Sequence, residues 1–181
     1  MSPMIRSPLT IEHALLGFLR RQPGHGYEIY QQLCDPAGLG LVWRIKQSQL
    51  YALLAKLEDK GYVTATLEPQ GTRPPRKVFE LTPAGRNVFL EWVQSPVPHG
   101  RQLRLDFLAK LYFARREDLA TQLIERQRIT CGEWLAAQQE QANAVEANQP
   151  YDWLVYRFRI GQIQAMLNWL DVCEQTLVNA P

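Results

Sequence analysis

The chain has 181 residues, of which 46% are hydrophobic and 21% are charged, and its formal net charge is +2. This composition is typical of a globular protein and excludes a mainly disordered chain, because disordered chains are poor in apolar residues and carry a large net charge. No apolar run approaches the roughly 18 residues of a membrane span, and the first residues do not resemble a secretory signal. Three widely spaced cysteines suit a reducing compartment, so we expect a cytoplasmic protein without disulfides or a membrane partner.

Charge and proline content divide the chain into two parts. Residues 1–95 carry 11 Lys and Arg against 8 Asp and Glu, whereas residues 96–181 carry 9 against 10. The segment 95–100, Ser-Pro-Val-Pro-His-Gly, is typical of a linker, since proline and glycine are unsuited to a helix interior. We therefore predict two domains, residues 1–95 and residues 96–181, with the positive surplus in the first.

The first domain opens with three predicted helices. Thr10 is a suitable N-cap for a helix that the Gln-Pro-Gly sequence at 22–24 ends. A short helix is predicted over about 26–34 and a third over about 48–60. In the third helix four leucines recur at the spacing of one helical face: Leu50, Leu53, Leu54 and Leu57.

A β-hairpin is predicted after the third helix. Residues 62–67 alternate with a period of two and are rich in β-branched residues, residues 69–75 resemble a turn, and residues 76–81 form the return strand. Thr82-Pro83 then opens another helix, with threonine as the cap and proline in the first helical position. Three helices, a hairpin and a helix in this order predict a winged helix-turn-helix.

The second domain is predicted to be entirely helical, with helices over about 103–113, 117–148 and 151–178. The apolar arc of the last helix covers roughly 240°, whereas a surface helix buries a stripe of roughly 100°. A domain of this size has too little core to cover that helix on all sides, so we expect a second copy of the chain against it. The predicted fold is mostly α: an N-terminal winged helix-turn-helix with a two-stranded β-wing, and a C-terminal α-helical dimerisation domain.

The sequence contains no pattern of catalytic or metal-binding residues. The three histidines, His13, His25 and His99, are far apart, and there is no HExxH, CxxC, GxGxxG or GxSxG motif. His13 fits a structural or solvated histidine within a helix, and His25 fits a loop. We therefore predict that the chain is not an enzyme and has no metal or cofactor.

The third helix is the predicted DNA-reading element. The second helix of a helix-turn-helix enters the major groove, where glutamine can pair with adenine and hydroxyl groups can reach phosphate. The candidate contacts on its polar face and just before its start are Lys46, Gln47, Ser48, Gln49, Tyr51 and Lys56.

The hairpin supplies a second set of candidate contacts. Arg73, Arg76 and Lys77 place three positive charges within five residues, around a stiff Pro74-Pro75. A basic wing of this kind suits the minor groove or the DNA backbone. Together, the helix and the wing predict a protein that binds double-stranded DNA.

Other interpretations of these residues remain open. Lys46 and Lys56 are of a type commonly solvated, Tyr51 of a type commonly half-buried in packing, and a basic hairpin can protect an edge strand. The whole domain can also be an adaptor that holds an acidic protein partner and never touches DNA. Five tryptophans raise the further hypothesis of a small aromatic effector, although they are more typical of core or dimer contacts.

Four blocks of sequence carry a resemblance to a known family: residues 15–19 (LLGFL), 26–29 (GYEI), 49–63 (QLYALLAKLEDKGYV) and 76–85 (RKVFELTPAG). In this order they resemble the PadR family of bacterial transcriptional regulators over about residues 9–95. The resemblance implies a homodimer on an inverted-repeat operator, commonly a repressor, which in some members is released by an aromatic compound. Tyr51 matches the third-helix tyrosine of the family, and Arg76 and Lys77 match its basic wing residues. Ala52 departs from the proline that often follows this tyrosine.

Overall fold

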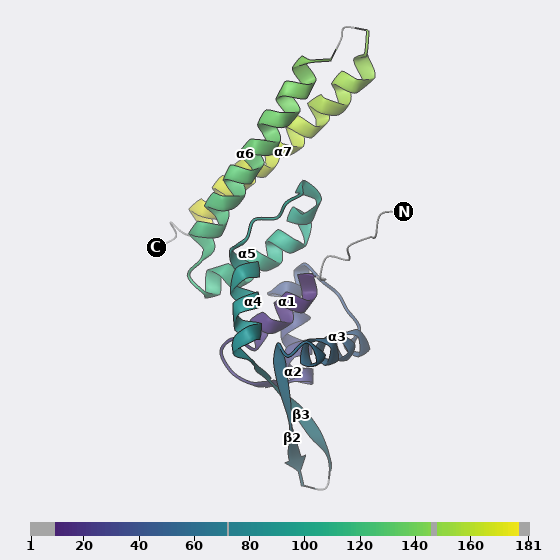
Figure 1. The fold of residues 1–181 in the computed structure, drawn as a ribbon, viewed down its shortest axis with the longest axis vertical. Coiled ribbons are helices and arrows are strands. Elements are labelled where there is room, and N and C mark those ends of the chain that lie inside the picture. Colours follow the sequence, from purple (N-terminus) through teal and green to yellow (C-terminus); the bar gives the residue numbers. More distant parts are fainter. Residues whose placement is uncertain (1–9, 72, 146–147, 178–181) are drawn as a thin grey trace. The chain divides into compact units, whose positions relative to one another are not determined.

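The computed structural model describes residues 10–71, 73–145 and 148–177 (Figure 1). Over these residues the chain is mostly helical with one small antiparallel sheet, and the predicted winged helix-turn-helix followed by a helical C-terminal region is confirmed. The elements in chain order are α1 (Thr10–Phe18), β1 (Gly24–His25), α2 (Gly26–Leu33), the 3₁₀ helix η1 (Leu39–Leu41), α3 (Gln47–Asp59), β2 (Val63–Gln70), β3 (Arg73–Leu81), α4 (Pro83–Gln94), the 3₁₀ helix η2 (Gly100–Arg104), α5 (Asp106–Arg116), α6 (Ala120–Asn143) and α7 (Pro150–Leu177).

These elements form two compact units. The first unit takes Met1–Val93 and Arg104–Phe113, and the second takes Gln94–Leu103 and Ala114–Pro181. Most of α5 therefore belongs to the first unit, although it follows the proline-rich segment. The domain boundary at residue 95 remains a prediction.

The core of the first unit joins α1, α3, α4 and α5. Helix α3 buries Leu50, Leu54 and Leu57 as its leucine spacing predicts, while Leu53 is half-buried. The ring of Phe113 from α5 packs edge-on against Phe89 of α4, with 5.6 Å between the ring centroids. This core fixes the inner face of α3 and leaves its outer face to the solvent.

The end of α3 and the start of α4 are fixed by local hydrogen bonds. Gly61 follows α3 with a φ of 71°, a left-handed conformation that glycine adopts without a steric cost, and its N–H donates to the carbonyl of Glu58 at 2.9 Å. The hydroxyl of Thr82 accepts the N–H of Gly85 at 3.0 Å and so caps α4, as predicted. The end of α3 and the start of α4 are therefore both fixed, and the hairpin connects them.

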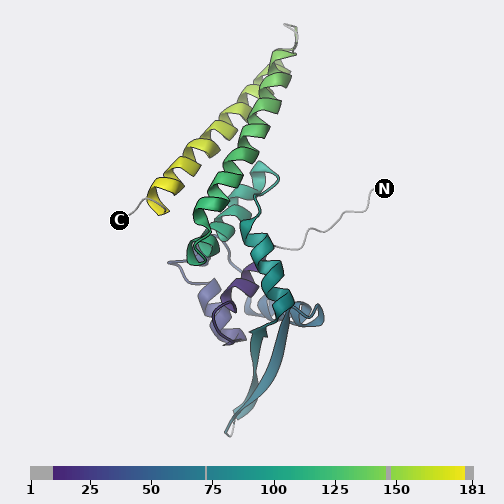
Figure 2. The ribbon, with the colours of Figure 1, turned by 60° about the vertical axis from the view of Figure 1, so that its left-hand side comes forward.

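The wing is longer than the sequence analysis predicted. Strand β3 lies between β1 and β2. Strands β2 and β3 form the long hairpin seen in Figure 2. They pair antiparallel from Val63↔Leu81 to Gln70↔Arg73, with a register shift between Glu68 and Gln70. The expected turn over 69–75 was therefore wrong, because Pro74 and Pro75 lie within β3. Beyond the two residues that pair with β1, one edge of β3 has no strand beside it among the described residues. Proline is tolerated at such edges and at bulges.

The second unit is built around α6 and α7, which lie side by side and run in opposite directions in both ribbon views. Arg128 of α6 donates to Asp171 at 2.9 Å and to Glu174 at 2.7 Å, both on α7. The buried side chain of Gln127 bonds the backbone N–H of Val97 at 2.7 Å and its carbonyl at 3.3 Å, so the proline-rich segment is fixed to α6.

Helix α6 is shorter than predicted, whereas α7 agrees with the prediction. The expected helix over 117–148 extends only from Ala120 to Asn143. Asp118 has a φ of 58°, in the left-handed region where a helix cannot continue, and this residue separates α5 from α6.

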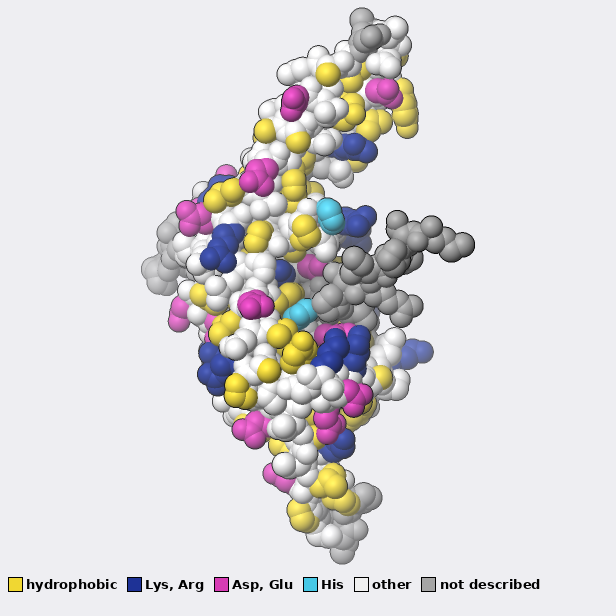
Figure 3. Space-filling view, viewed as in Figure 1, with side chains coloured by type: hydrophobic (Ala, Val, Ile, Leu, Met, Phe, Trp, Pro, Cys, Tyr) yellow, Lys and Arg dark blue, Asp and Glu magenta, His cyan; other side chains and the backbone are white. Residues whose placement is uncertain are grey.

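Hydrophobic side chains remain open on the α6–α7 pair and gather near its end at the start of α7 (Figure 3). We call the exposed hydrophobic residues of this pair the open apolar surface: Ile129, Tyr151, Trp153, Leu154, Phe158 and Val172. No helix among the described residues has both the length and the apolar character to cross a membrane.

Candidate nucleic-acid interface

Helix α3 presents an outer face that has polar side chains at its start and small side chains in its middle. Gln47, Ser48, Tyr51, Ala52 and Ala55 are exposed, on the side opposite the buried leucines. The major groove of B-DNA is about 12 Å wide and admits one α-helix. Because alanine side chains are short, this face allows the helix backbone to come close to base edges.

The start of α3 is held by its own side chains. Lys46 precedes the helix in an extended conformation, and its N–H donates to Oε1 of Gln49 at 2.9 Å. The amide oxygen of Gln49 is therefore engaged as a helix cap, and bidentate pairing with adenine would require it to be released. Gln47 and Ser48 stay exposed at the same end.

Tyr51 both packs and projects. A Cβ atom on Gly26 would lie 2.5 Å from Cε1 and 3.2 Å from the hydroxyl oxygen of Tyr51, so the absence of a side chain at Gly26 lets the ring rest on the start of α2. The Tyr51 side chain is still 42% exposed. Both interpretations of this residue, packing and contact, are therefore compatible with its position.

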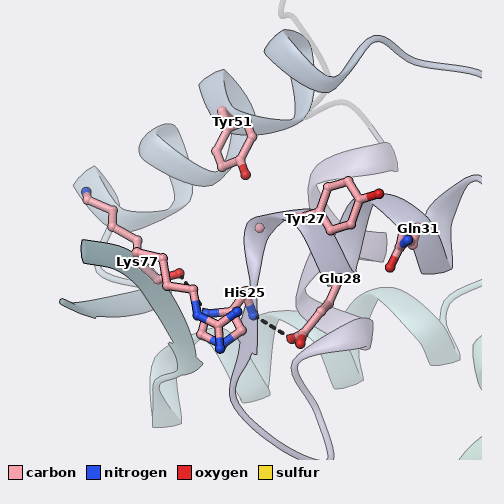
Figure 4. A pocket seen from close by; sticks show the side chains of 8 residues that line it. His25, Tyr27, Glu28, Gln31, Tyr51 and Lys77 are labelled. Carbon is pink, nitrogen blue, oxygen red and sulfur yellow. Dashed lines mark hydrogen bonds between the residues drawn. The ribbon is translucent and has the colours of Figure 1, made fainter. Parts of the chain in front are cut away.

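A hollow of about 420 Å³ lies between the start of α2, the outer face of α3 and the middle of β3 (Figure 4). Figure 4 shows Tyr27, Glu28 and Gln31 on α2, Tyr51 on α3 and Lys77 on β3 around it. Its lining residues are His25, Gly26, Tyr27, Glu28, Gln31, Tyr51, Arg76 and Lys77. Two predicted wing residues are thus brought to the predicted helix residue Tyr51.

The charges around this hollow are of both signs. The carboxylate of Glu28 accepts the backbone N–H of His25 at 3.0 Å and so occupies the positive end of α2. On the wing, Nζ of Lys77 donates to the carboxylate of Glu58 on α3 at 3.0 Å. Lys77 therefore joins the wing to α3 before any ligand is present. Arg76 also lines the hollow, and the side chain of Arg73 lies outside the described residues.

Lys56 has a partner that the sequence analysis did not anticipate. Its Nζ lies 2.5 Å from Oε1 of Glu12, and Nζ of Lys60 lies 3.1 Å from Oε2 of the same carboxylate. The Glu12 side chain is only 3% exposed. Burial acts to raise the pKa of Glu12, but the hydrogen bonds and charges of the two lysines outweigh it and hold the pKa below its usual value. This ion cluster fastens α3 to α1.

Several residues of the site were missed by the sequence analysis. His25, expected in a loop, is the second residue of β1, and Tyr27 and Gln31 border the hollow from α2. A strand of two residues carries no alternation that sequence reasoning can detect. His13 does agree with its structural interpretation, because its ring stacks on Trp92 with 5.5 Å between centroids.

The exposed helix α3, the preceding α2 and the β2–β3 hairpin define the class of a winged helix-turn-helix protein. The model of the transcriptional regulator PadR-like family matches residues 15–91, the stretch that contains α2, α3 and the hairpin. The resemblance to this family seen in the sequence is thereby confirmed over the matched residues.

Two curated proteins and one solved structure illustrate the similarity. The negative transcriptional regulator PadR of Bacillus subtilis is 33% identical over 104 residues, 58% of this chain and 56% of the relative, so the match spans little more than half of that protein. The Mycobacterium tuberculosis protein named "Probable transcriptional regulator Rv1176c" is 26% identical over 187 positions, covering 93% of this chain and 98% of the relative. The crystal structure of Bacillus subtilis PadR in complex with operator DNA is 25% identical and covers 92% of this chain and 97% of that chain, with a TM-score of 0.49.

Both curated relatives are named transcriptional regulators, and neither name is that of an enzyme. Among the residues that the structure describes, no group of three His, Cys, Asp or Glu side chains is arranged to hold a metal ion.

Proposed function

We propose that this chain is a DNA-binding transcriptional repressor that acts as a homodimer on an inverted-repeat operator. The observation that carries the proposal is the outer face of α3, which is open to solvent and stands next to the wing within one compact unit. Repression is proposed because the Bacillus subtilis relative is named a negative regulator. As a transcriptional regulator, the protein would act in the cytoplasm. The N-terminal domain, residues 1–95, would make the contacts with DNA.

In this proposal α3 enters the major groove. Gln47, Ser48 and the side-chain amide nitrogen of Gln49 face base edges, and Ala52 permits close approach. Lys46, which is exposed just before the helix, meets a backbone phosphate, as does the hydroxyl of Tyr51 at the edge of the hollow.

The wing and Lys56 have different places in the proposal. Arg76, and the predicted contact Arg73, meet the DNA backbone beside the groove that α3 fills. Lys77 and Lys56 add positive charge to the DNA-facing side. Lys77 is already bonded to Glu58 and Lys56 to Glu12, so their main effect is to hold the wing and α3 in place.

The open apolar surface supports the proposed homodimer. Phe158 is 66% exposed and Leu154 is 58% exposed, one turn apart on α7. Exposed large apolar side chains that gather in one place are characteristic of association surfaces. A second copy is the occupant we propose, because two-fold symmetric dimers are the commonest assembly and fit an inverted-repeat operator.

Selection of DNA from a random-sequence pool by the purified protein tests the function. The proposal predicts enrichment of one sequence with two inverted half-sites, separated by about one helical turn or a multiple of it. Failure to enrich any sequence at low salt would refute DNA recognition and leave the alternative of a protein-binding adaptor.

A small aromatic effector stays a prediction. Titration of aromatic acids and planar cations into the complex with the selected DNA measures it directly. The prediction holds if a compound quenches tryptophan fluorescence and releases the DNA over the same concentration range. It fails if no compound in a broad panel changes either signal.

A further inference from the structure

His25 contacts three elements beside the middle of the wing. Its backbone N–H donates to Glu28 on α2 at 3.0 Å, and as part of β1 it pairs with Val78 of β3. Its Nδ1 lies 3.4 Å from the carbonyl oxygen of Lys77, and its Nε2 lies 3.7 Å from Oε2 of Glu68 on β2. The His25 side chain is only 14% exposed. One nearly buried imidazole therefore reaches both strands of the hairpin from the start of α2.

The contact with Glu68 falls at a particular point of the wing. The β2–β3 ladder is regular from Val63↔Leu81 to Glu68↔Arg76, and the register then shifts before the last pair, Gln70↔Arg73. His25 thus meets the last regular pair before the interruption. Because a bulge bends and twists a hairpin locally, the direction of the distal wing depends on how this pair is held.

Lys77 is held at both of its ends. Its carbonyl oxygen is bonded to His25, and its Nζ is bonded to Glu58 on α3. The second bond is an exposed ion pair, with Lys77 51% and Glu58 33% exposed, and such pairs contribute little alone. Of the two side chains that bond to Lys77, the His25 imidazole is more buried than the Glu58 carboxylate.

We propose that His25 is a positioning residue that fixes the wing relative to α2 and α3, so that the wing and α3 meet DNA as one rigid surface. The inference rests on the proposed function, and His25 itself does not touch DNA. A wing that is already ordered loses less conformational freedom on binding than a mobile one, which increases affinity without a new contact.

The experiment compares three substitutions of His25 with the wild type, using the selected DNA. His25→Ala removes both side-chain contacts. In His25→Asn the amide group takes the place of Nδ1 and can still reach the Lys77 carbonyl, whereas in His25→Gln it takes the place of Nε2 and can still reach Glu68. His99→Ala, an exposed histidine of the other unit, is the matched control.

We expect His25→Ala to weaken DNA binding by roughly 5-fold to 10-fold, the effect of removing one hydrogen bond together with the contact with the Glu68 carboxylate. We expect Asn or Gln to restore affinity to near the wild-type value, and the one that does so identifies the contact that matters. Wild-type affinity in His25→Ala would overturn the proposal. Equal weakening in all three variants would also overturn it, because the imidazole would then act only through its volume.

A second readout does not require DNA. Hydrogen exchange of the backbone amides of β2 and β3 should accelerate in His25→Ala while exchange in α1 and α4 stays unchanged. Unchanged exchange in the wing, or equal acceleration in every element, would contradict a positioning role. If the wild type selects no DNA, the proposed function fails while this exchange measurement still decides how the wing is held.

Discussion

At the scale of single residues, Tyr51 shows that packing and contact need not be alternatives. Its ring rests on the start of α2 at a place where only glycine fits, and its hydroxyl borders the hollow that Arg76 and Lys77 also line. The packing fixes the direction of the hydroxyl, and a fixed donor loses little freedom when it meets a phosphate.

The hydroxyl of Tyr51 can be tested without disturbing the ring. In Tyr51→Phe we expect a loss of DNA affinity of roughly 10-fold, because a hydrogen bond to a charged group is removed while the packing on Gly26 stays. Titration of the selected DNA, monitored by fluorescence anisotropy, measures the change. Unchanged affinity would show that Tyr51 only packs. An unchanged melting temperature of the free protein is the control for folding.

The roles of individual polar residues could be predicted from the sequence only where they depend on near neighbours. The threonine cap at Thr82 was predictable because its partner is three residues away. The role of Lys56 was not, because its partner Glu12 lies 44 residues away. The same limit applies to His25, whose partners Glu68 and Lys77 come from the other end of the domain.

At the scale of elements, α3 is placed by its leucines on one side and by the Glu12 cluster on the other. The leucine spacing was readable from the sequence and predicted the buried face correctly, apart from Leu53. The wing was only partly predictable. Two adjacent prolines normally indicate a turn, but here the free edge of β3 accommodates them within a strand.

The Glu12 cluster predicts a stability that depends on pH. The folded chain holds the pKa of Glu12 below the usual 4.5, so the unfolded chain takes up the proton first as the pH falls. The contribution of Glu12 is therefore complete above pH 4.5 and is lost below it. We expect Glu12→Gln to lower the free energy of unfolding at pH 7 by about 1 to 2 kcal/mol, since Lys56 and Lys60 are partly exposed.

Urea unfolding between pH 3 and pH 7 measures this effect. The difference between the wild type and Glu12→Gln should shrink as the pH falls through the acid range. A difference that stays constant with pH would contradict the ion cluster. Glu80→Gln, which changes an exposed carboxylate on β3, serves as the control.

The charges of the wing predict how DNA binding depends on salt. In the double variant Arg76→Ala/Lys77→Ala we expect weaker binding and a smaller slope of log affinity against log salt, by about one unit for each phosphate that the variant no longer binds. Affinity measured at several salt concentrations gives this slope. An unchanged slope would show that the wing does not bind the DNA backbone.

At the scale of the whole molecule, the apolar character of α7 was predictable from the sequence. The structure shows which of its apolar residues stay exposed. Ile160, Ile163 and Leu170 are buried within the second unit, whereas Leu154 and Phe158 are not. The sequence shows that the apolar arc of α7 is too wide to be covered within one chain. Which residues of that arc α6 covers depends on how the two helices pack, and this cannot be derived from the sequence.

Phe158 tests the proposed dimer. A Phe158→Ser substitution should weaken self-association by roughly 100-fold or more, because each of the two copies loses a buried aromatic ring. Light scattering coupled to gel filtration measures the mass as protein concentration falls. Gln162→Ser, an exposed polar residue one turn further along α7, should leave the mass unchanged. A wild-type protein that is monomeric at all concentrations would refute the dimer.

The placement of α3 in the DNA groove can be measured by photocrosslinking. A photoreactive side chain at Gln47, which is exposed at the start of α3, is placed in an otherwise unchanged protein bound to its selected DNA. We predict crosslinks to bases within each half-site, at equivalent positions on the two sides of the symmetry centre. Crosslinks that are absent or scattered along the duplex, while the labelled protein retains its affinity, would contradict the reading of DNA by α3.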